Sequence, residues 1–342
     1  MPPKTGQRYS DWIYNRDLID SLPSPFALYA TLRRLAVIIP AKRFHAPTTF
    51  ALLSRLESRL TSYYRQRPSR RFQKVIAAWG PHWIDMGDER VGMVLRELYG
   101  VDPTLELFPR LLAGCDVFLD IGSNHGTFAM SASASMCPDA EIIAFEPQSS
   151  LATLIERTFR ENRLSRAKVL NVALSDNSGR SILAEDCANS GIAQLEPNST
   201  ECIGGATNFV DCARLDEVIE KLNIHGQRWA IKIDVEGHEL KVFQGGQAVL
   251  RDRHPLIICE INCDALNRFS STPDDLLSFL RGFGYDTFID VDIFPEPLSV
   301  QKVSSARHAY NFIALSSVHQ VRQLETIRSM PKAGRGESSW LH

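Results

Sequence analysis

The sequence predicts an α/β fold built on a mostly parallel, Rossmann-like sheet, and three observations support this prediction. First, buried apolar segments alternate with amphipathic segments across residues 117–315, as expected for strands joined by helices. Second, one apolar segment leads into a glycine-containing turn and then into helical spacing. Third, acidic residues follow several apolar segments, at the positions where the carboxyl ends of parallel strands meet. Folds of this class bind their ligands at that edge of the sheet.

The clearest element is the segment VFLDIGSNHG at residues 117–126. An apolar run ends in Asp120, breaks into a turn between Gly122 and Gly126, and is followed by small and apolar residues at helical spacing. Gly126 lacks the Cβ that would keep backbone and ligand apart, and the turn leaves backbone N–H groups free at the start of the helix. Asp120 stands at the carboxyl end of the strand, where it suits a ligand with a cationic ammonium group better than a diphosphate.

A second predicted strand, residues 141–145, ends in Glu146, about twenty residues beyond Gly126, where such folds place an acid on ribose hydroxyls. An amino-acid head joined to a ribose describes S-adenosylmethionine (AdoMet), so the two motifs predict an AdoMet site. A nicotinamide-dependent oxidoreductase would use the same sheet. It needs the pattern G-x-G-x-x-G, however, and here the order is D-x-G-x-x-x-G.

Predicted helices and strands continue to alternate up to residue 315. The helices are residues 151–162, 215–222, 239–250 and 274–283, and the strands are residues 167–172, 179–184, 229–233, 256–259, 285–290 and 311–315. Ala173, Ser175 and Asp176 follow the third strand at its carboxyl edge, where they are placed to bound an adenine. Residues 185–208 lack periodicity and are rich in Gly, Ser, Asn and Cys, so we expect a substrate-facing loop there.

The second chemical motif is KIDVEGHE at residues 232–239. Four ionisable side chains come directly after the predicted strand at 229–233, and they are Asp234, Glu236, His238 and Glu239. Because ligands bind at the carboxyl ends of parallel strands, we expect this motif to face the same site as the first two. Lys232 is expected to lie within the strand, with its ammonium group directed toward a carboxylate. The next strand also ends in an acid, Glu260.

The composition is that of a globular chain with an uneven distribution of charge. Hydrophobic residues make up 44% and charged residues 23%, which provides a sizeable core and excludes wholesale disorder. Residues 1–74 hold 14 Lys and Arg against 4 Asp and Glu, so the remainder holds 24 against 36. The seven cysteines form no paired framework, and Cys115 and Cys259 lie beside or within apolar strands, which is typical of reduced thiols.

Residues 1–74 are predicted to form a basic helical region, with helices at residues 26–39 and 50–64. A basic arm could touch an anionic partner or membrane surface, but we prefer a solvated helical face that also packs on the acidic part of the chain. We expect an exposed linker at residues 65–74, a connecting helical segment at 75–116, and a tail at 319–342 that is disordered from residue 329. No signal peptide is visible, and the apolar run at 26–39 is too short to span a bilayer, so the cytoplasm is the expected location.

Together, the segments DIGSNHGTF, FEPQSS, NVALSD, KIDVEGHEL and IICEI, in this order and spacing, resemble the FkbM-type methyltransferases. The resemblance covers residues 117–315, and its most specific part is KIDVEG after the fourth strand. It implies a domain at residues 117–318 with the Rossmann-like fold of class I AdoMet-dependent methyltransferases. That fold has a seven-stranded, mainly parallel sheet with the last strand antiparallel. The resemblance also implies AdoMet as cofactor, and O-methylation of a hydroxyl on a sugar, a polyketide or another small-molecule or glycan acceptor.

The resemblance assigns roles to individual residues. Those that match its cofactor motifs are Asp120, Gly122, Asn124, Gly126 and Glu146, and Ser123 stands among them where the family often has alanine. Asp234, Glu236 and Gly237 match the acidic motif near the transferred methyl group, and Asp234 is predicted to contact the cofactor as well. We hypothesise that Asp234 or His238 is the general base and that Glu236 orients the acceptor.

Several alternatives stay open at this point. Glu236, Glu239 and Glu260 could share a divalent cation, although we favour a site without a metal. The acidic motif would also suit N-methylation of a small amine, and a non-catalytic scaffold could use the basic arm as its binding surface. Nucleic acid is disfavoured as a partner, because the catalytic half is acidic and phosphate contacts require clustered Lys and Arg. The basic region at residues 1–74 could also serve as a dimerisation element and so form a homo-oligomer.

Overall fold

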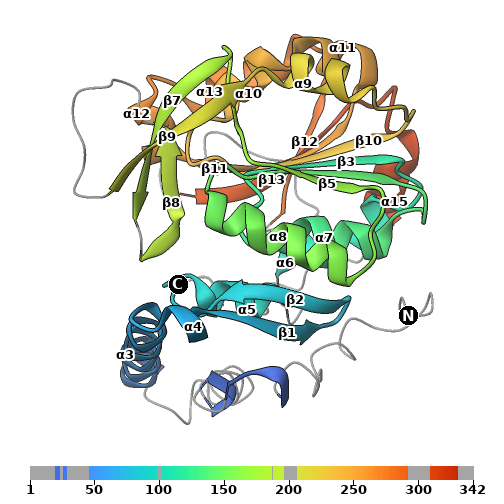
Figure 1. Ribbon diagram of the computed structural model, residues 1–342. Helices are drawn as coiled ribbons and strands as arrows, with labels where there is room; N and C mark the ends of the chain where they lie inside the picture. Colours follow the sequence, from blue (N-terminus) through green and yellow to red (C-terminus); the bar gives the residue numbers. More distant parts are fainter. Residues whose placement is uncertain are drawn as a thin grey trace.

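The structure is a computed structural model that describes residues 20–23, 26–28, 46–98, 102–186, 188–195, 206–291 and 309–329. Figure 1 shows a central sheet with helices above and below it, a small sheet at one end of the central sheet, and an N-terminal layer beneath the lower helices. None of the described helices combines the length and apolar composition needed to cross a bilayer. The predicted tail beyond residue 329 lies outside the described residues.

The central sheet has seven strands in the order β12-β13-β11-β10-β3-β4-β5. The strands are β3 (Val117–Ile121), β4 (Glu141–Phe145), β5 (Ala167–Leu170), β10 (Trp229–Ile233), β11 (Leu256–Asn262), β12 (Thr287–Asp290) and β13 (Ala309–Leu315). β13 pairs antiparallel with both of its neighbours, while the pairs around β3 and β10 are parallel. This confirms the predicted seven-stranded sheet. The chain leaves β3 toward β4 on one side and returns through β10 on the other, so the switch point where ligands bind lies beside β3.

Helices cover both faces of this sheet, as Figure 1 shows. One face carries α6 (Pro103–Leu111), α7 (Thr127–Ser135), α8 (Ser149–Glu161) and α15 (Val321–Ser329), and the other carries α9 (Leu215–Leu222), α10 (Glu239–Gly245), α11 (Gln247–Arg253) and α13 (Pro273–Arg281). Alternate side chains of β3 enter the two cores: Leu119 packs toward α9 and α10, and Phe118 toward α6 and α7. The helix predicted at 239–250 is interrupted at Gly246, where a Cβ would lie 2.8 Å from the Leu215 side chain.

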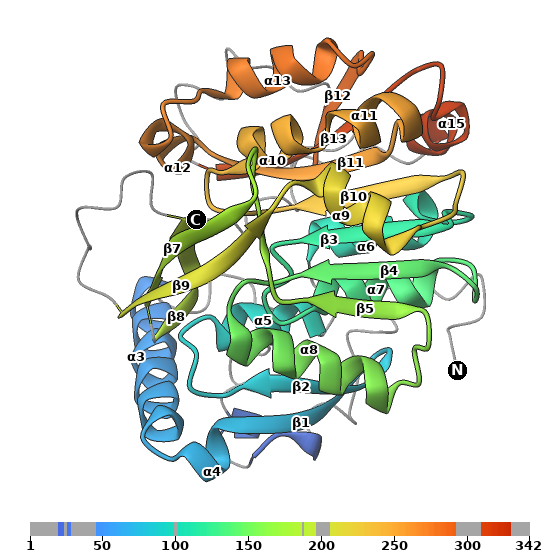
Figure 2. The ribbon, with the colours of Figure 1, turned by 45° about the horizontal axis from the view of Figure 1, so that its top comes forward.

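The second sheet has four strands in the order β6-β9-β7-β8. They are β6 (Ala173–Leu174), β7 (Gly179–Asp186), β8 (Asn189–Leu195) and β9 (Ala206–Ala213), and they stand at the carboxyl end of β5 (Figure 2). The prediction of an irregular loop at 185–208 is therefore wrong for its described residues. One face of this sheet is buried through Leu183, Leu195 and Val210. Val210 and Cys212 stand at alternate positions of β9, as in a half-buried strand, whereas the apolar residues of β7 are consecutive and show no such pattern in the sequence.

The N-terminal layer contains a β-hairpin that the sequence analysis does not predict. It consists of α3 (Ala46–Arg65), α4 (Pro68–Arg71), β1 (Phe72–Ala77), β2 (Gly80–Asp85) and α5 (Val91–Leu98). The predicted helix at 50–64 is confirmed within α3. The predicted linker at 65–74 is wrong, because β1 begins at Phe72, and the segment at 75–116 is not purely helical. Only residues 26–28 of the helix predicted at 26–39 are described, and they are helical.

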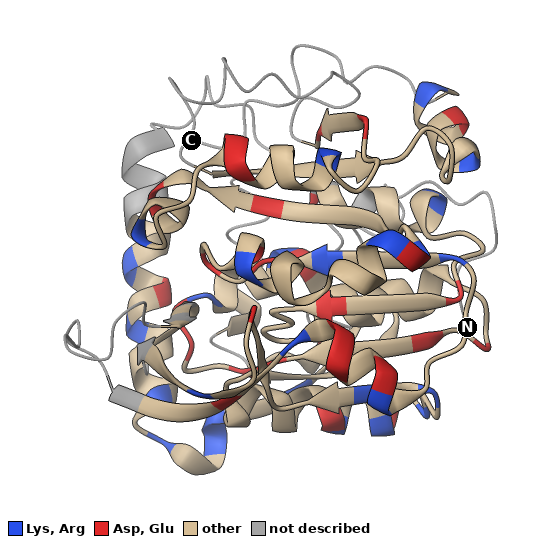
Figure 3. Ribbon diagram, turned by 90° about the horizontal axis from the view of Figure 1, so that it is seen from above, with Lys and Arg blue, Asp and Glu red and all other residues tan. Residues whose placement is uncertain are grey.

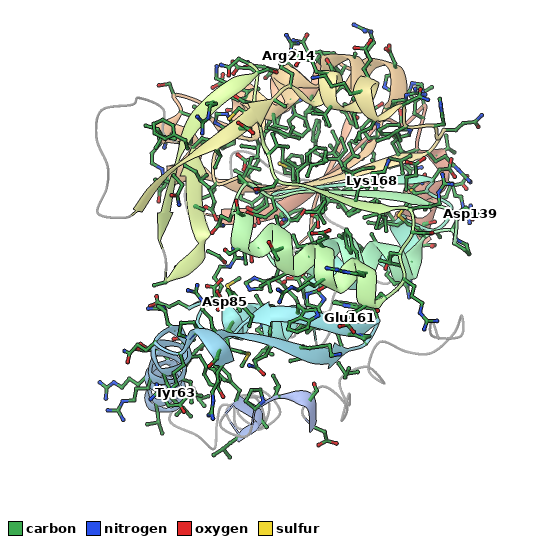
Figure 4. All side chains as sticks on the ribbon, in the orientation of Figure 1. Tyr63, Asp85, Asp139, Glu161, Lys168 and Arg214 are labelled. Atoms are coloured by element: carbon green, nitrogen blue, oxygen red, sulfur yellow. The ribbon has the colours of Figure 1, made fainter. Side chains whose placement is uncertain are left out.

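Basic residues of this layer form ion pairs within the chain. Arg71 reaches Asp85 at 2.7 Å, and Lys74 reaches Glu161 of α8 at 3.2 Å. Figure 4 shows Asp85 and Glu161 along the boundary between the layer and α8. Figure 3 shows further basic positions along α3, at the left of that view. Of these two pairs, only the one between Lys74 and Glu161 joins the layer to the acidic part of the chain, and the preference for a solvated helical face that packs there stays a prediction.

Candidate functional site

The turn after β3 adopts a conformation that only glycine allows at its first position. Gly122 has φ 76°, and a Cβ built on it would lie 1.9 Å from the carbonyl oxygen of Asp234. The backbone N–H groups of Gly122 and Ser123 both donate to the carbonyl oxygen of Phe145, at 3.0 Å each. The turn is therefore clamped between the ends of β10 and β4, which brings the predicted motifs together.

Asp120 supports this turn from the interior instead of facing a ligand. Its side chain is fully buried, and its Oδ2 accepts a hydrogen bond from the Ala129 N–H of α7 at 3.0 Å. Burial raises the pKa of Asp120 to about 6, against the effect of nearby Lys232. Ser123 also turns inward and donates to the Asp120 carbonyl oxygen at 2.7 Å, and Gly126 is the N-cap of α7. The expectation that Asp120 directly contacts a cationic ligand group is not met.

Glu146 lies at the end of β4, where the sequence places it. Its carboxylate accepts hydrogen bonds from the backbone N–H of Asn124 at 2.7 Å and from that of Gln148 at 2.8 Å. The side chain is almost fully buried. A carboxylate held at a strand end by backbone donors is a fixed acceptor, which is suited to binding paired hydroxyl groups.

Asp234 follows β10 and is part of a buried network of charges. The Lys232 ammonium group lies 3.1 Å from Asp234 Oδ2, as predicted, and 4.7 Å above the ring of Phe128. Burial raises the pKa of Asp234, but the positive charges of Lys232 and Arg90 outweigh this and hold the pKa below its usual range. The Asp234 charge, together with burial, raises the pKa of Glu260 well above its usual range. Asp234 is therefore a stabilised carboxylate and a poor proton acceptor.

Glu236 has a different environment from Asp234, two residues away. Its backbone is in the left-handed region at φ 54°, which costs a non-glycine residue about 1–3 kcal/mol and is typical of functional turns. Burial and the Asp234 charge raise the pKa of Glu236 to about 8. No described residue hydrogen-bonds to its carboxyl group. Glu236 is thus a largely protonated carboxyl group that can donate a hydrogen bond to a ligand.

His238 is oriented by a short chain of hydrogen bonds. Ser175 Oγ donates to Asp176 Oδ1 at 3.1 Å and lies 2.9 Å from His238 Nε2. A carboxylate can only accept, so the single Ser175 proton is directed at Asp176, and His238 Nε2–H must donate to Ser175 Oγ. Nδ1 is then the unprotonated nitrogen; it is buried and has no partner among the described residues. Burial lowers the pKa of His238 to about 4, so the ring is neutral at physiological pH.

Glu239 braces the motif from within and does not reach a ligand position. It is almost fully buried, and its Oε1 accepts hydrogen bonds from the backbone N–H of Val235 at 3.1 Å and of Gly237 at 3.2 Å. Burial raises the pKa of Glu239 to about 7. Within the part of the chain that the structure describes, no group of three or more His, Cys, Asp or Glu side chains is arranged to hold a metal ion.

Arg90, from the N-terminal layer, enters the site and is the main residue that sequence reasoning missed. Its side chain passes beneath β8 so closely that a Cβ on Gly191 would lie 2.1 Å from Arg90 Cδ. Its backbone N–H donates to Asp88 at 2.8 Å. Its charge acts on Asp234 and Glu236. Nothing in the sequence around Arg90 signals this role, because the contact depends on how the N-terminal layer packs beneath the small sheet.

Ser190 of β8 covers the same site. Its Oγ accepts a hydrogen bond from Asn124 Nδ2 at 2.9 Å, and its carbonyl oxygen accepts one from Gln148 Nε2 at 2.9 Å. Asp88 accepts a further bond from the Ser190 N–H at 3.3 Å. β8 is therefore tied to the turn after β3 and to the end of β4.

These residues enclose what we call the cofactor cavity. Of the predicted site residues, those in its wall are Gly122, Asn124, Glu146, Ala173, Asp234, Glu236 and His238. Its apolar part is formed by Val172, Leu174, Leu183, Ala193 and Leu195. The cavity has a volume of about 60 Å³, whereas pockets for drug-sized ligands span about 300–1,000 Å³. A ligand of that size therefore requires this cavity to widen.

A second cavity, which we call the polar cavity, adjoins the first. It has a volume of about 520 Å³ and is lined by Ser175, Asp176, Arg180, Lys241, Arg268 and Phe269, among others. Ser175 and Asp176 thus face this cavity and not the predicted adenine position. The two cavities share His238 and Leu195.

The strand order, with acids from the ends of β4 and β10 in one cavity beside the switch point, defines a class I methyltransferase fold. Residues 120–287 match the family model described as the methyltransferase FkbM domain. This part of the chain is therefore a methyltransferase FkbM domain. No curated protein shows significant similarity to it in sequence.

Similar solved structures include three methyltransferase-fold proteins. Methyltransferase FkbM from Methylobacillus flagellatus KT is 12% identical with a TM-score of 0.39, over 66% of this chain and 54% of that one. Precorrin-6y C5,15-methyltransferase from Geobacter metallireducens GS-15 is 14% identical with a TM-score of 0.35, over 63% and 87%. Aeropyrum pernix fibrillarin in complex with S-adenosyl-L-methionine is 14% identical with a TM-score of 0.35, over 59% and 68%. The chain thus spans about half the length of the first of these.

Proposed function

We propose that this methyltransferase uses AdoMet and methylates a hydroxyl group of a sugar, a polyketide or another small-molecule or glycan acceptor. The observation that carries the proposal is the wall of the cofactor cavity. It combines Glu146 at the end of β4, the glycine turn after β3 and Asp234 at the end of β10. These are the groups that a ribose and an amino-acid head require, and they meet at the switch point of the sheet.

The rest of the cavity fits the cofactor chemically. Val172, Leu183 and Leu195 supply apolar surface for an adenine, and Glu146 supplies a fixed acceptor for ribose hydroxyls. Gly122 and Asn124 line the cavity beside Asp234, where the proposal places the amino-acid part of the cofactor. When bound, AdoMet supplies an electrophilic methyl group on a positively charged sulfur.

The residues around that methyl position favour a neutral oxygen acceptor over an amine. Lys232 and Arg90 offset the negative charge of Asp234, and Glu236 is largely protonated near neutral pH. A cationic amine would gain little attraction from such a wall. N-methylation of a small amine is accordingly the weaker candidate.

His238 is the better of the two hypothesised bases. Asp234 is bound to Lys232 and hydrogen-bonded by Glu260, whereas His238 Nδ1 is unprotonated and unpartnered. In the proposal His238 Nδ1 accepts the hydroxyl proton, its tautomer is set by Ser175, and Glu236 orients the acceptor by donating a hydrogen bond. Positioned groups of this kind typically contribute about 10²–10⁴-fold to the rate.

Two experiments test the proposal. A thermal shift with AdoMet compared with NAD checks the cofactor, and we expect stabilisation by AdoMet alone. A transfer assay with isotopically labelled AdoMet over panels of sugars, polyketides and amines checks the acceptor. Stabilisation by NAD but not by AdoMet, or labelling of amines only, would overturn the corresponding part.

A further inference from the structure

The polar cavity differs from the cofactor cavity in size and in the charge of its lining residues. It is large enough, at about 520 Å³, for a monosaccharide or a molecule of similar size. Five stretches of the chain line it: residues 175–181 up to the start of β7, Leu195 of β8, Cys212 of β9, His238 and Lys241 at the start of α10, and residues 268–270 at the end of α12 (Cys263–Arg268). The cavity is therefore a product of the tertiary fold and not of one motif.

Its charge is positive. Arg180, Lys241 and Arg268 line it against a single carboxylate, Asp176. Lys241 and Asp176 neutralise each other through an ion pair at 2.8 Å. Arg180 approaches Asp211 only at 3.8 Å, with both side chains more than two-thirds exposed, so this pair contributes little.

Arg268 is the cation with most of its hydrogen-bonding capacity available. No described residue forms a hydrogen bond or an ion pair with its guanidinium group. A planar guanidinium presents several N–H donors in a fixed arrangement that matches the oxygens of a carboxylate or phosphate. Arg268 and Arg180 together therefore provide the charge for one anionic group.

The polar cavity also adjoins the reacting centre. His238 lines both cavities, is more than nine-tenths buried, and has an unpartnered Nδ1. Phe269 packs edge-on against the His238 ring, with centroids 4.9 Å apart. Arg268 is close enough to Glu236 for its charge to be felt there. A molecule held by Arg268 thus lies next to both groups that the proposed transfer uses.

We propose that the polar cavity binds the methyl acceptor, and that this acceptor carries a phosphate or carboxylate group recognised by Arg180 and Arg268. The inference rests on the proposed function, because it places the acceptor against a donor in the cofactor cavity. It narrows the acceptor class from hydroxylated small molecules in general to anionic ones, such as sugar phosphates or uronic acids.

Binding of simple anions tests the site itself. Inorganic phosphate and acetate are titrated into the full-length protein saturated with AdoMet, with the melting temperature as readout. We expect saturable stabilisation by at least one anion. The double variant Arg180→Gln/Arg268→Gln should weaken that anion's apparent affinity at least about tenfold, while Arg160→Gln, an exposed arginine on α8, should not. Absence of saturable stabilisation in the wild type, or equal stabilisation of the double variant, would overturn the inference.

Steady-state kinetics with different acceptors then test whether the enzyme recognises a phosphate or a carboxylate group on the acceptor. With labelled AdoMet as methyl donor, glucose 6-phosphate, glucuronate and glucose are compared as acceptors. The other hydroxylated acceptors of the panel are tested in their charged and neutral forms in the same way. We expect a lower KM for a charged form than for its neutral counterpart, and a loss of this preference in the double variant. Equal KM values for charged and neutral forms contradict the inference. Failure of the protein to bind AdoMet contradicts the proposed function instead, so the two failures are distinguishable.

Discussion

The cofactor cavity and the polar cavity share His238 and Leu195 but differ in charge, size and origin. The first is small and rich in carboxyl groups, and it lies between strand ends of the central sheet and the covering strands β7 and β8. The second is about eight times larger by volume, carries an excess of cations, and is built from segments outside that sheet. In the proposed function this difference corresponds to two tasks: the cofactor cavity would hold the methyl donor and the polar cavity would select the acceptor.

The largest expected effect tests the residue that connects the two cavities. Replacement His238→Ala removes the only group proposed to take the hydroxyl proton, so kcat should fall by about 10²–10⁴-fold. AdoMet affinity should stay within a few-fold of wild type, because His238 is not among the groups proposed to bind the ribose or the amino-acid head. Single-turnover kinetics and calorimetry measure the two quantities separately. A normal kcat would transfer the role of base to another residue.

A smaller effect, on the free energy of unfolding, is expected for a change in the turn after β3 that lines the cofactor cavity. In Gly122→Ala the new Cβ would meet the Asp234 carbonyl oxygen at 1.9 Å, at a residue with φ 76°. We expect a loss of about 3 kcal/mol or more in the free energy of unfolding, from strain and from separation of the ends of β3 and β10. Gly284→Ala is the matched control, since Gly284 has φ 84° but no atom within 4 Å of a Cβ. Equal urea midpoints for the two variants would show that the clash is relieved by movement.

A still smaller effect, on AdoMet affinity, is expected for a change in β8, which covers the cofactor cavity. Ser190→Ala removes the hydrogen bond from Asn124 Nδ2 that ties β8 to the turn. The closed arrangement loses about 0.5–1.5 kcal/mol, so AdoMet affinity should rise by about two- to tenfold if β8 must open for entry. Calorimetry measures the change. Reduced affinity would mean that the Ser190 hydroxyl contacts the ligand instead of closing the empty cavity.

The smallest expected effect is on the pH profile. With His238 titrating near pH 4 and Glu236 near pH 8, kcat should be nearly constant between these values and drop to about half at pH 8. The rate should fall as the pH rises because Glu236 donates a hydrogen bond only while it is protonated, and its deprotonation removes that bond. Glu236→Gln keeps a donor and should abolish the fall. An activity that increases through pH 8 would instead make the Glu236 carboxylate the base.

Most of the central sheet and half of the cofactor cavity could be predicted from the sequence, because local patterns determine them. The strands at Glu141–Phe145 and Trp229–Ile233 have the predicted bounds, and Glu146, Gly122 and Asp234 meet as their positions at strand ends require. Asp120 was misjudged because a residue at a strand end can point either way, and its side chain turns inward to cap α7.

The polar cavity and the entry of Arg90 could not be predicted, for a physical reason. Arg90 reaches the site across the interface between the N-terminal layer and β8, and Arg268 lines the same cavity as Arg180 although the two are far apart in the sequence. Such contacts leave no periodicity or spacing in a single sequence. The sequence around Gly191 gives no sign of its close contact with Arg90, because Gly191 stands among polar residues like many loop glycines.

The most direct measurement is isothermal titration of AdoMet into the full-length wild type and Glu146→Gln, with Arg160→Gln as control. The account predicts saturable binding to the wild type and the control, and affinity at least about tenfold lower for Glu146→Gln, which cannot accept two charge-assisted hydrogen bonds from ribose hydroxyls. A folded wild-type protein that does not bind AdoMet, or an unchanged affinity in Glu146→Gln, would contradict the central claim.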